Sequence, residues 1–388
     1  MSAAPSAVGG RLAFLDGLRA LAALWVVLGH VYLFAVGWQA QSAWAAMPLN
    51  ALMYMHLGVV VFLVLSGYCL ALPVVRNGGR AAAGWPAFFR ARAWRILPPY
   101  LATLALILLI NCFVPLAAWG RHDLGLTPTV SGAVWWSNLL LLQDVYGQYN
   151  NINAPFWSVA CEWHLYWVFP LLVWVLRRHG VAALVLLGAV SAVALTLLSA
   201  RYPRLPLLDA SVPQPPYFIV LFVLGVAAAA LVNGQGRGVA AARRAALPAA
   251  AVLLALLAGV LYHYRIADAA GAIRFAGLHP LIDPLAGAFT AALLAGLTGL
   301  APAHGLRRLF EGRALVCIGG FSYSLYLIHI PVVAAARHAL MQLPAYAALS
   351  YLQGFCVLAL VAVPACLVLA WGFAWVFERR PGRPAGKP

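Results

Sequence analysis

The chain has 388 residues, of which 64% are hydrophobic and only 9% are charged. A soluble domain carries about a quarter of its residues as charged side chains, so this composition excludes an ordinary water-soluble fold. The net charge of +16 comes from 24 arginines and one lysine, which lie mostly in short clusters between apolar runs. That placement is typical of membrane topology and argues against a nucleic-acid-binding surface.

Ten apolar segments are close to the roughly 20 residues that cross a bilayer. They predict an all-α polytopic membrane protein with a single domain over residues 1–388. The segments are 12–35, 54–73, 96–116, 156–176, 180–199, 217–233, 246–264, 284–301, 315–336 and 349–377. A shorter stretch, 134–142, predicts a helix that lies flat or re-enters. The first segment lacks a signal-peptide cleavage site, so we expect it to stay in the mature protein.

The distribution of basic residues predicts the orientation of these segments. If the N-terminus is cytosolic, 18 of the 25 basic residues fall in inner loops and tails and six fall in outer loops, with Arg19 inside the first segment. Because cytosolic loops carry the excess of Arg and Lys, both termini are predicted to be cytosolic. The six cysteines lie in or beside apolar segments without metal-ligand spacing, so we expect no disulfide and no metal.

The first segment carries ionisable residues that are costly in lipid. Arg19 and His30 are eleven positions apart, which places them on one helix face and about 16 Å apart along the axis. Asp16 precedes Arg19 by one turn and can pair with it. These residues indicate a functional site. The alternative is a structural Arg–Asp pair and a hydrogen-bonded core histidine.

Two further segments carry charge at the membrane. Arg92 and Arg95 lie one turn apart before an apolar run, and their planar donor forks suit phosphate oxygens. The alternative is ordinary positive charge at the inner boundary. Glu162 is expected at about the depth of His30, and Ser158 lies on the same helix face. A lone Glu at that depth predicts a partner or a water-filled cavity. The alternative is that Glu162 only ties helices together.

Hydroxyl-bearing residues mark two more segments. The sequence GGFSYSLYLIHIPVV supplies Ser322, Tyr323 and His329. The sequence VVVFLVLSGYCLALP supplies Ser66 beside Gly67. Small residues and hydroxyls are also ordinary contacts between membrane helices, so neither segment is specific alone.

Taken together, these segments resemble the acyltransferase-3 family of bacterial integral membrane acyltransferases. The matching stretches are LDGLRALAALWVVLGH, FLVLSGYCL, RAWRILPPY, WSVACEWHLYWVFP and FSYSLYLIHIPV, in the family's order and across essentially the whole chain. The resemblance implies ten helices, a place in the bacterial inner membrane and use of acyl-CoA. It looks like the stand-alone form, without an appended SGNH-type domain.

The family's functional residues carry over by motif. Its essential Arg and His fall on Arg19 and His30, its Arg-x-x-Arg on Arg92 and Arg95, its Trp-Ser…Glu on Trp157, Ser158 and Glu162, and its Ser-Tyr…His on Ser322, Tyr323 and His329. The sequence departs from the family at Trp163-His164, where many members have a second acidic or amide residue. That departure weakens the case for a two-carboxylate site.

These residues lead to a hypothesis for acyl transfer. Acyl-CoA, by default acetyl-CoA, is expected as the donor, with its phosphates on Arg92 and Arg95 and with Arg19 and Ser66 along its path. His30 is the expected general base.

The other site residues are assigned to orientation, charge stabilisation and the acceptor. Glu162 is expected to orient His30. Ser322 or Tyr323 is expected to donate to the oxyanion. Acceptor binding is assigned to three residues: Trp157, Ser158 and His329.

The acceptor is expected to be a hydroxyl of a cell-envelope or exported glycan, and no permanent cofactor is expected. One rival interpretation is a multi-pass transporter or flippase, in which Arg19, His30 and Glu162 form a polar pathway. A second is a non-catalytic assembly protein, in which the polar groups hold helices together. The sequence leaves the oligomeric state open.

Overall fold

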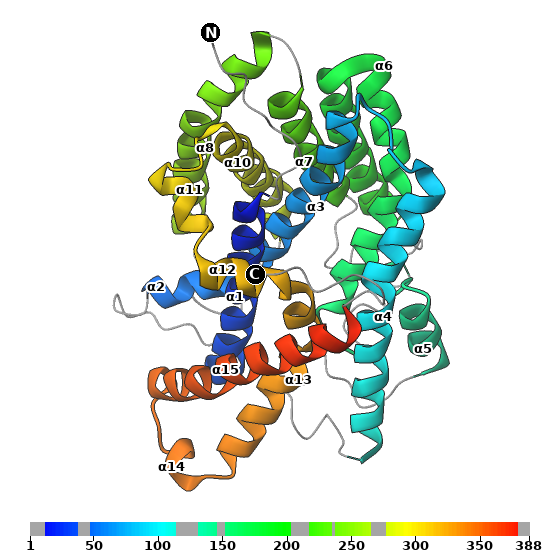
Figure 1. The fold of residues 1–388 in the computed structure, drawn as a ribbon. Coiled ribbons are helices and arrows are strands. Elements are labelled where there is room, and N and C mark those ends of the chain that lie inside the picture. Colours follow the sequence, from blue (N-terminus) through cyan, green and yellow to red (C-terminus); the bar gives the residue numbers. More distant parts are fainter. Residues whose placement is uncertain are drawn as a thin grey trace.

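The structure, a computed structural model, describes residues 12–37, 47–113, 131–145, 152–202, 217–234, 237–264 and 277–378. Within these ranges the regular elements are all helices (Figure 1). Eight of them are long and apolar enough to cross a membrane. The prediction of an all-α polytopic membrane protein is therefore confirmed.

The helices follow one another without a long soluble insertion among the described residues. In chain order they are α1 (Ala13–Val36), α2 (Met47–Asn50), the 3-10 helix η2 (Ala51–Tyr54), α3 (His56–Arg76), α4 (Gly84–Phe113), α5 (Gly132–Leu139), α6 (Phe156–Arg201), α7 (Phe218–Asn233), α8 (Arg237–His263), α10 (His279–Gly299), α11 (Gly305–Phe310), α12 (Arg313–Gly320), α13 (Ser322–Met341), α14 (Pro344–Ala347) and α15 (Tyr351–Phe377).

Two features reconcile these helices with the ten expected apolar segments. Helix α6 has 46 residues, but Gly180 inside it has φ +81° and ψ −176°, so the backbone breaks between the expected segments 156–176 and 180–199. Glycine suits this position because a positive φ is costly for residues with a Cβ. Helix α7 corresponds to the expected segment 217–233, but with 16 residues it is shorter than the eight helices counted as long enough to cross a membrane.

Several helix bounds differ from the expectation. Helix α4 begins at Gly84 rather than at residue 96, so its arginines lie on the helix itself, and Pro98 and Pro99 lie within it. The expected segment 315–336 is divided at Phe321 into α12 and α13. Helix α8 also starts earlier than residue 246. The short stretch 134–142 forms the eight-residue helix α5 and a following turn.

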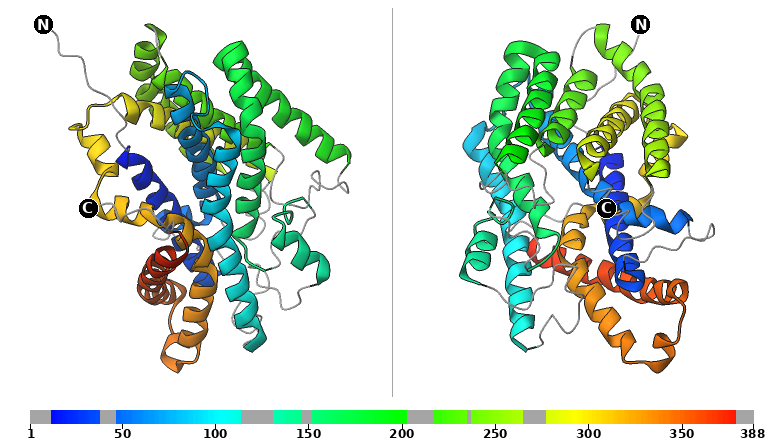
Figure 2. Two further views of the ribbon diagram at one scale, coloured as in Figure 1. Left: turned by 45° about the vertical axis from the view of Figure 1, so that its right-hand side comes forward. Right: turned by 180° about the vertical axis from the view of Figure 1, so that it is seen from behind.

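Helix α1 lies near the centre of the molecule. It packs against α3, α12, α13 and α15, while α3 packs along α7 and α7 packs against α6 (Figures 1 and 2). Helix α15 crosses α1 and α13 in the lower half of Figure 1. This arrangement brings the polar residues of α1, α3, α4, α6 and α13 toward one another.

Close packing of α3 on α7 depends on two glycines. A Cβ at Gly67 would overlap the carbonyl oxygen of Phe222, and a Cβ at Gly225 would overlap that of Val64. Each helix therefore presents a glycine to the other's backbone, which is how membrane helices approach closely. This contact fixes α3, and with it the neighbouring Ser66.

Candidate active site

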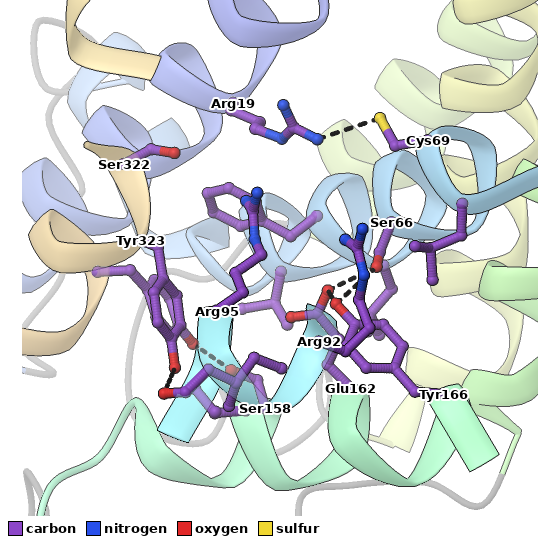
Figure 3. A pocket seen from close by; sticks show the side chains of 17 residues that line it. Arg19, Ser66, Cys69, Arg92, Arg95, Ser158, Glu162, Tyr166, Ser322 and Tyr323 are labelled. Atoms are coloured by element: carbon purple, nitrogen blue, oxygen red, sulfur yellow. Dashed lines mark hydrogen bonds between the residues drawn. The ribbon is translucent and has the colours of Figure 1, made fainter. Parts of the chain in front are cut away.

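A pocket opens between five of the apolar helices (Figure 3). Its empty volume is about 770 Å³, including the space at its mouth. Apolar residues of α3 form much of its wall, and polar side chains converge from all five helices. Those polar and sulfur-bearing residues are Arg19, Ser66, Cys69, Arg92, Arg95, Ser158, Glu162, Tyr166, Ser322, Tyr323 and Tyr326.

Arg19 is held in place by two contacts. Its Nη1 donates to Asp16 Oδ1 at 2.9 Å, and its Nη2 donates to Cys69 Sγ at 3.1 Å. Asp16 is almost fully buried, so the ion pair is partly shielded from water. The predicted pairing of Asp16 with Arg19 is observed. Arg19 also lines the pocket, so its guanidinium can face a bound ligand.

Two more guanidiniums enter the pocket from α4. Arg92 and Arg95 are one turn apart and both line it (Figure 3). The guanidinium carbon of Arg92 lies 5.9 Å from the centre of the Phe88 ring, a cation–π distance. With Arg19, the pocket has three cationic side chains from two helices. Their planar donor forks match the oxygens of a phosphate or carboxylate.

Glu162 brings a negatively charged side chain into the pocket lining beside the three arginines. Its Oε1 accepts hydrogen bonds from Ser66 Oγ at 2.5 Å and from Tyr166 OH at 2.6 Å. These bonds join α6 to α3. The expected contact between Glu162 and His30 is not observed. Glu162 instead bonds to Ser66 and Tyr166, which line the same pocket as the three arginines, called the arginine pocket from here on.

His30 instead pairs with His329. The Nδ1 atom of His30 lies 2.8 Å from the carbonyl oxygen of Val26 and 3.2 Å from Nε2 of His329. His329 Nδ1 donates to the carbonyl oxygen of Tyr326 at 2.7 Å, which leaves its Nε2 as an acceptor. A neutral His30 with its proton on Nδ1 satisfies both contacts. Its Nε2 then carries the lone pair.

The histidine pair and the pocket are joined through Tyr326. Tyr326 lines the pocket, and its hydroxyl is 2.7 Å from Ser158 Oγ. His329 follows one turn later on α13 and is fully buried. His30 and His329 therefore lie one helical turn beyond one end of the pocket. Because His329 is enclosed, the structure does not place it where an acceptor would contact it.

Three other predicted residues have partners that differ from their expected roles. Ser322 Oγ donates to Gly319 O at 2.9 Å, and Tyr323 OH donates to Ile96 O at 3.2 Å. Both hydroxyl protons are thus directed at backbone carbonyls and not toward a developing oxyanion. Trp157 lies outside the pocket lining and stacks near His56, with ring centroids 6.4 Å apart.

Three of the polar or sulfur-bearing pocket residues were not predicted as site residues: Cys69, Tyr166 and Tyr326. Each follows a predicted site residue on the same helix by one turn, namely Ser66, Glu162 and Ser322 or Tyr323. Helical periodicity would have identified them as candidates on the same face. Their side-chain types gave no separate signal, because Cys and Tyr are common between membrane helices.

Comparison with known proteins gives the class of protein that the chain resembles. A family model described as an acyltransferase domain matches residues 12–372. The chain is also 27% identical over 341 residues to "Acyltransferase MdmB" from Streptomyces mycarofaciens, covering 83% of this chain and 79% of that protein. No solved structure matches the chain significantly.

Proposed function

This chain belongs to the acyltransferase-3 family, and we propose that it transfers an acyl group from acyl-coenzyme A to a hydroxyl of a cell-envelope or exported glycan. As a multi-pass membrane acyltransferase it must bind an acyl donor and an acceptor. Acetyl is the acyl group we propose, and the bacterial inner membrane is the proposed location. The convergence of Arg19, Arg92 and Arg95 on one pocket is the observation that carries the choice of donor.

The donor is assigned to the arginine pocket by charge. Three guanidiniums and one carboxylate line it, so its charged side chains sum to a positive charge. The phosphates of coenzyme A are polyanionic and would dock on Arg92 and Arg95 through paired hydrogen bonds. Arg19 and His30 are about 16 Å apart along α1. A pantetheine arm of similar length would carry the thioester toward the histidine pair.

His30 is the proposed general base. With Nδ1 engaged by Val26, its Nε2 takes the proton of the acceptor hydroxyl as that oxygen attacks the thioester carbonyl. The carbon–sulfur bond then breaks, and the departing thiolate takes the proton back from the imidazolium. The products are the acyl ester and free coenzyme A. His329 contacts the same Nδ1 atom through its Nε2 and so helps to position the His30 ring.

Glu162 is assigned a positioning role. Through Ser66 and Tyr166 it fixes the side of the pocket opposite Arg19, and its charge limits the repulsion between the arginines of α4. Ser158 and Tyr326 form the boundary between the donor pocket and the histidine pair. We propose that the acceptor hydroxyl approaches at this boundary.

The donor half of the proposal is tested by coenzyme A binding. Arg95→Ala should weaken binding to the purified protein in nanodiscs by about 10- to 150-fold, because a charge-assisted hydrogen bond contributes about 1.5–3 kcal/mol. Arg90→Ala is the matched control, since Arg90 is exposed on the same helix and does not line the pocket. Equal affinities for both variants would remove the arginine pocket as the donor site.

The catalytic half is tested by acyl transfer from labelled acetyl-CoA to the glycan fraction of the host. His30→Asn keeps an amide N–H near the position of Nδ1 but has no equivalent of Nε2, and His30→Ala removes the side chain. Both should bind coenzyme A normally and lose transfer by about 100-fold or more, the range for a general base. Full activity of either variant at normal membrane levels would remove His30 from the mechanism.

A further inference from the structure

A second polar cluster lies outside the arginine pocket, between α3 and α10. It consists of His56, the first residue of α3, and of His279 and Asp283, which are one turn apart at the start of α10. One ligand atom from each of the three residues lies within 4.8 Å of the others. Histidine nitrogens and a carboxylate oxygen are the donors that zinc-class cations prefer.

Asp283 indicates that the cluster is built for positive charge. Its side chain is completely buried. Its Oδ2 accepts from His56 Nε2 at 2.9 Å and from Tyr217 OH at 3.0 Å, whereas its Oδ1 has no hydrogen-bond partner among the described residues. A buried carboxylate oxygen without a donor is costly. A cation beside Asp283 would remove that cost.

The two imidazoles are close enough to share a ligand. The rings of His56 and His279 are parallel within 2°, with centroids 4.3 Å apart. Rotation of one ring about its Cβ–Cγ bond would direct a nitrogen of each at a common point beside Asp283. A stacked ring pair contributes only about 0.5–1.5 kcal/mol, which metal coordination would readily exceed.

We propose that His56, His279 and Asp283 bind a divalent cation of the zinc class. The His-x-x-x-Asp spacing of α10 places two ligands on one helix face, as in zinc-binding helices. In a tetrahedral site with bonds of about 2.0–2.1 Å, neighbouring ligand atoms lie about 3.3 Å apart, close to the His56–Asp283 separation. The Tyr217 hydroxyl serves as the outer partner that orients the carboxylate.

The bound cation would join the first turns of α3 and α10, leaving its fourth position for water or another ligand. This site is separate from the arginine pocket and does not depend on acyl transfer. It also departs from the expectation of no metal. That expectation relied on short ligand spacings, whereas Asp283 follows His56 by 227 positions.

Metal content of the full-length protein tests the proposal. The purified protein, with any polyhistidine tag removed, is stripped with a chelator, incubated with Zn²⁺, desalted and analysed for zinc. Wild type should retain one equivalent, and Asp283→Asn and His279→Asn should lose it. His304→Asn is the matched control and should retain it, because His304 is exposed beyond the opposite end of α10 and caps α11.

A second measurement avoids dependence on the variants' folding. Co²⁺ added to the stripped wild type should give the intense visible absorption of a four-coordinate site, and Zn²⁺ should displace it. Zn²⁺ should also raise the Tm of wild type and of His304→Asn. Failure of wild type to bind Co²⁺ or Zn²⁺ would overturn the proposal. So would unchanged zinc content in well-folded His279→Asn and Asp283→Asn.

Discussion

Glu162 shares its pocket with Arg92 and Arg95 and accepts hydrogen bonds from Ser66 and Tyr166. If the proposed donor binds here, its phosphates would compete with this negative charge for the guanidiniums. Glu162→Gln keeps an oxygen that can accept both hydrogen bonds but removes the charge. We therefore expect the variant to fold normally and to bind coenzyme A several-fold more tightly, since each 1.4 kcal/mol is tenfold in affinity. Isothermal titration at two ionic strengths measures this.

The salt dependence separates charge from shape. The gain from Glu162→Gln should shrink at high salt, because exposed charges in the pocket mouth are screened there. Glu162→Ala is the companion variant, and it should also lower Tm by leaving Ser66 and Tyr166 without their acceptor. Weaker coenzyme A binding by Glu162→Gln would show instead that the carboxylate holds the arginines in their binding positions.

At the scale of single residues, contacts between neighbours on one helix could be predicted from the sequence, whereas contacts between residues of different helices could not. Asp16 and Arg19 are one turn apart on one helix, so their ion pair follows from helical geometry. The depth estimate placed Glu162 level with His30, but depth does not specify the direction in which a side chain points. The rotations of α1 and α6 direct these residues to different partners, and rotation depends on packing that periodicity alone does not determine.

The contact between α3 and α7 is sensitive to a small change in side-chain volume. A Cβ at Gly67 would overlap the backbone of α7, and a backbone carbonyl cannot move aside as a flexible side chain can. Gly67→Ala should therefore destabilise the protein by about 1–3 kcal/mol or more through overpacking. It should also shift Ser66 and weaken donor binding. Thermal unfolding in detergent measures the first effect and coenzyme A binding measures the second.

Gly259→Ala is the control for this helix contact. Gly259 lies on α8, where an added Cβ would meet nothing within 4 Å. Alanine favours a helix over glycine by about 1 kcal/mol, so this substitution should be neutral or stabilising. A Gly67→Ala protein as stable as Gly259→Ala would contradict the close packing of α3 on α7.

The existence of the helices could be predicted, but several of their ends could not. Long apolar runs predict spans because a lipid environment requires internal backbone hydrogen bonds. The start of α4 was placed twelve residues too late because Arg90, Arg92 and Arg95 make its first turns look like a loop. Arginines on a membrane helix can extend their charged groups toward water or into a pocket. The division at Phe321, in contrast, directly follows Gly319 and Gly320, and a glycine pair is a helix-breaking signal that the expected segment 315–336 leaves out of account.

At the scale of the whole molecule, the distribution of basic residues predicts which site residues face the cytosol and which face the outer side of the membrane. The basic residues predict a cytosolic N-terminus, which places Arg19 toward the cytosol and His30 toward the outer face of α1. Arg92 and Arg95 lie in the first half of α4, and Arg80, in the loop before α4, is also predicted to be inside. The donor site and the proposed base would therefore face opposite sides of the membrane.

This arrangement predicts vectorial transfer. Coenzyme A is too highly charged to cross a bilayer, so labelled acetyl-CoA added to sealed vesicles reaches one face only. Inverted vesicles, with the cytosolic face outward, should acylate glycan trapped inside at least tenfold faster than right-side-out vesicles. Detergent should abolish the difference. Equal rates in both kinds of intact vesicle, or faster transfer in right-side-out vesicles, would contradict entry of the donor from the arginine-rich side.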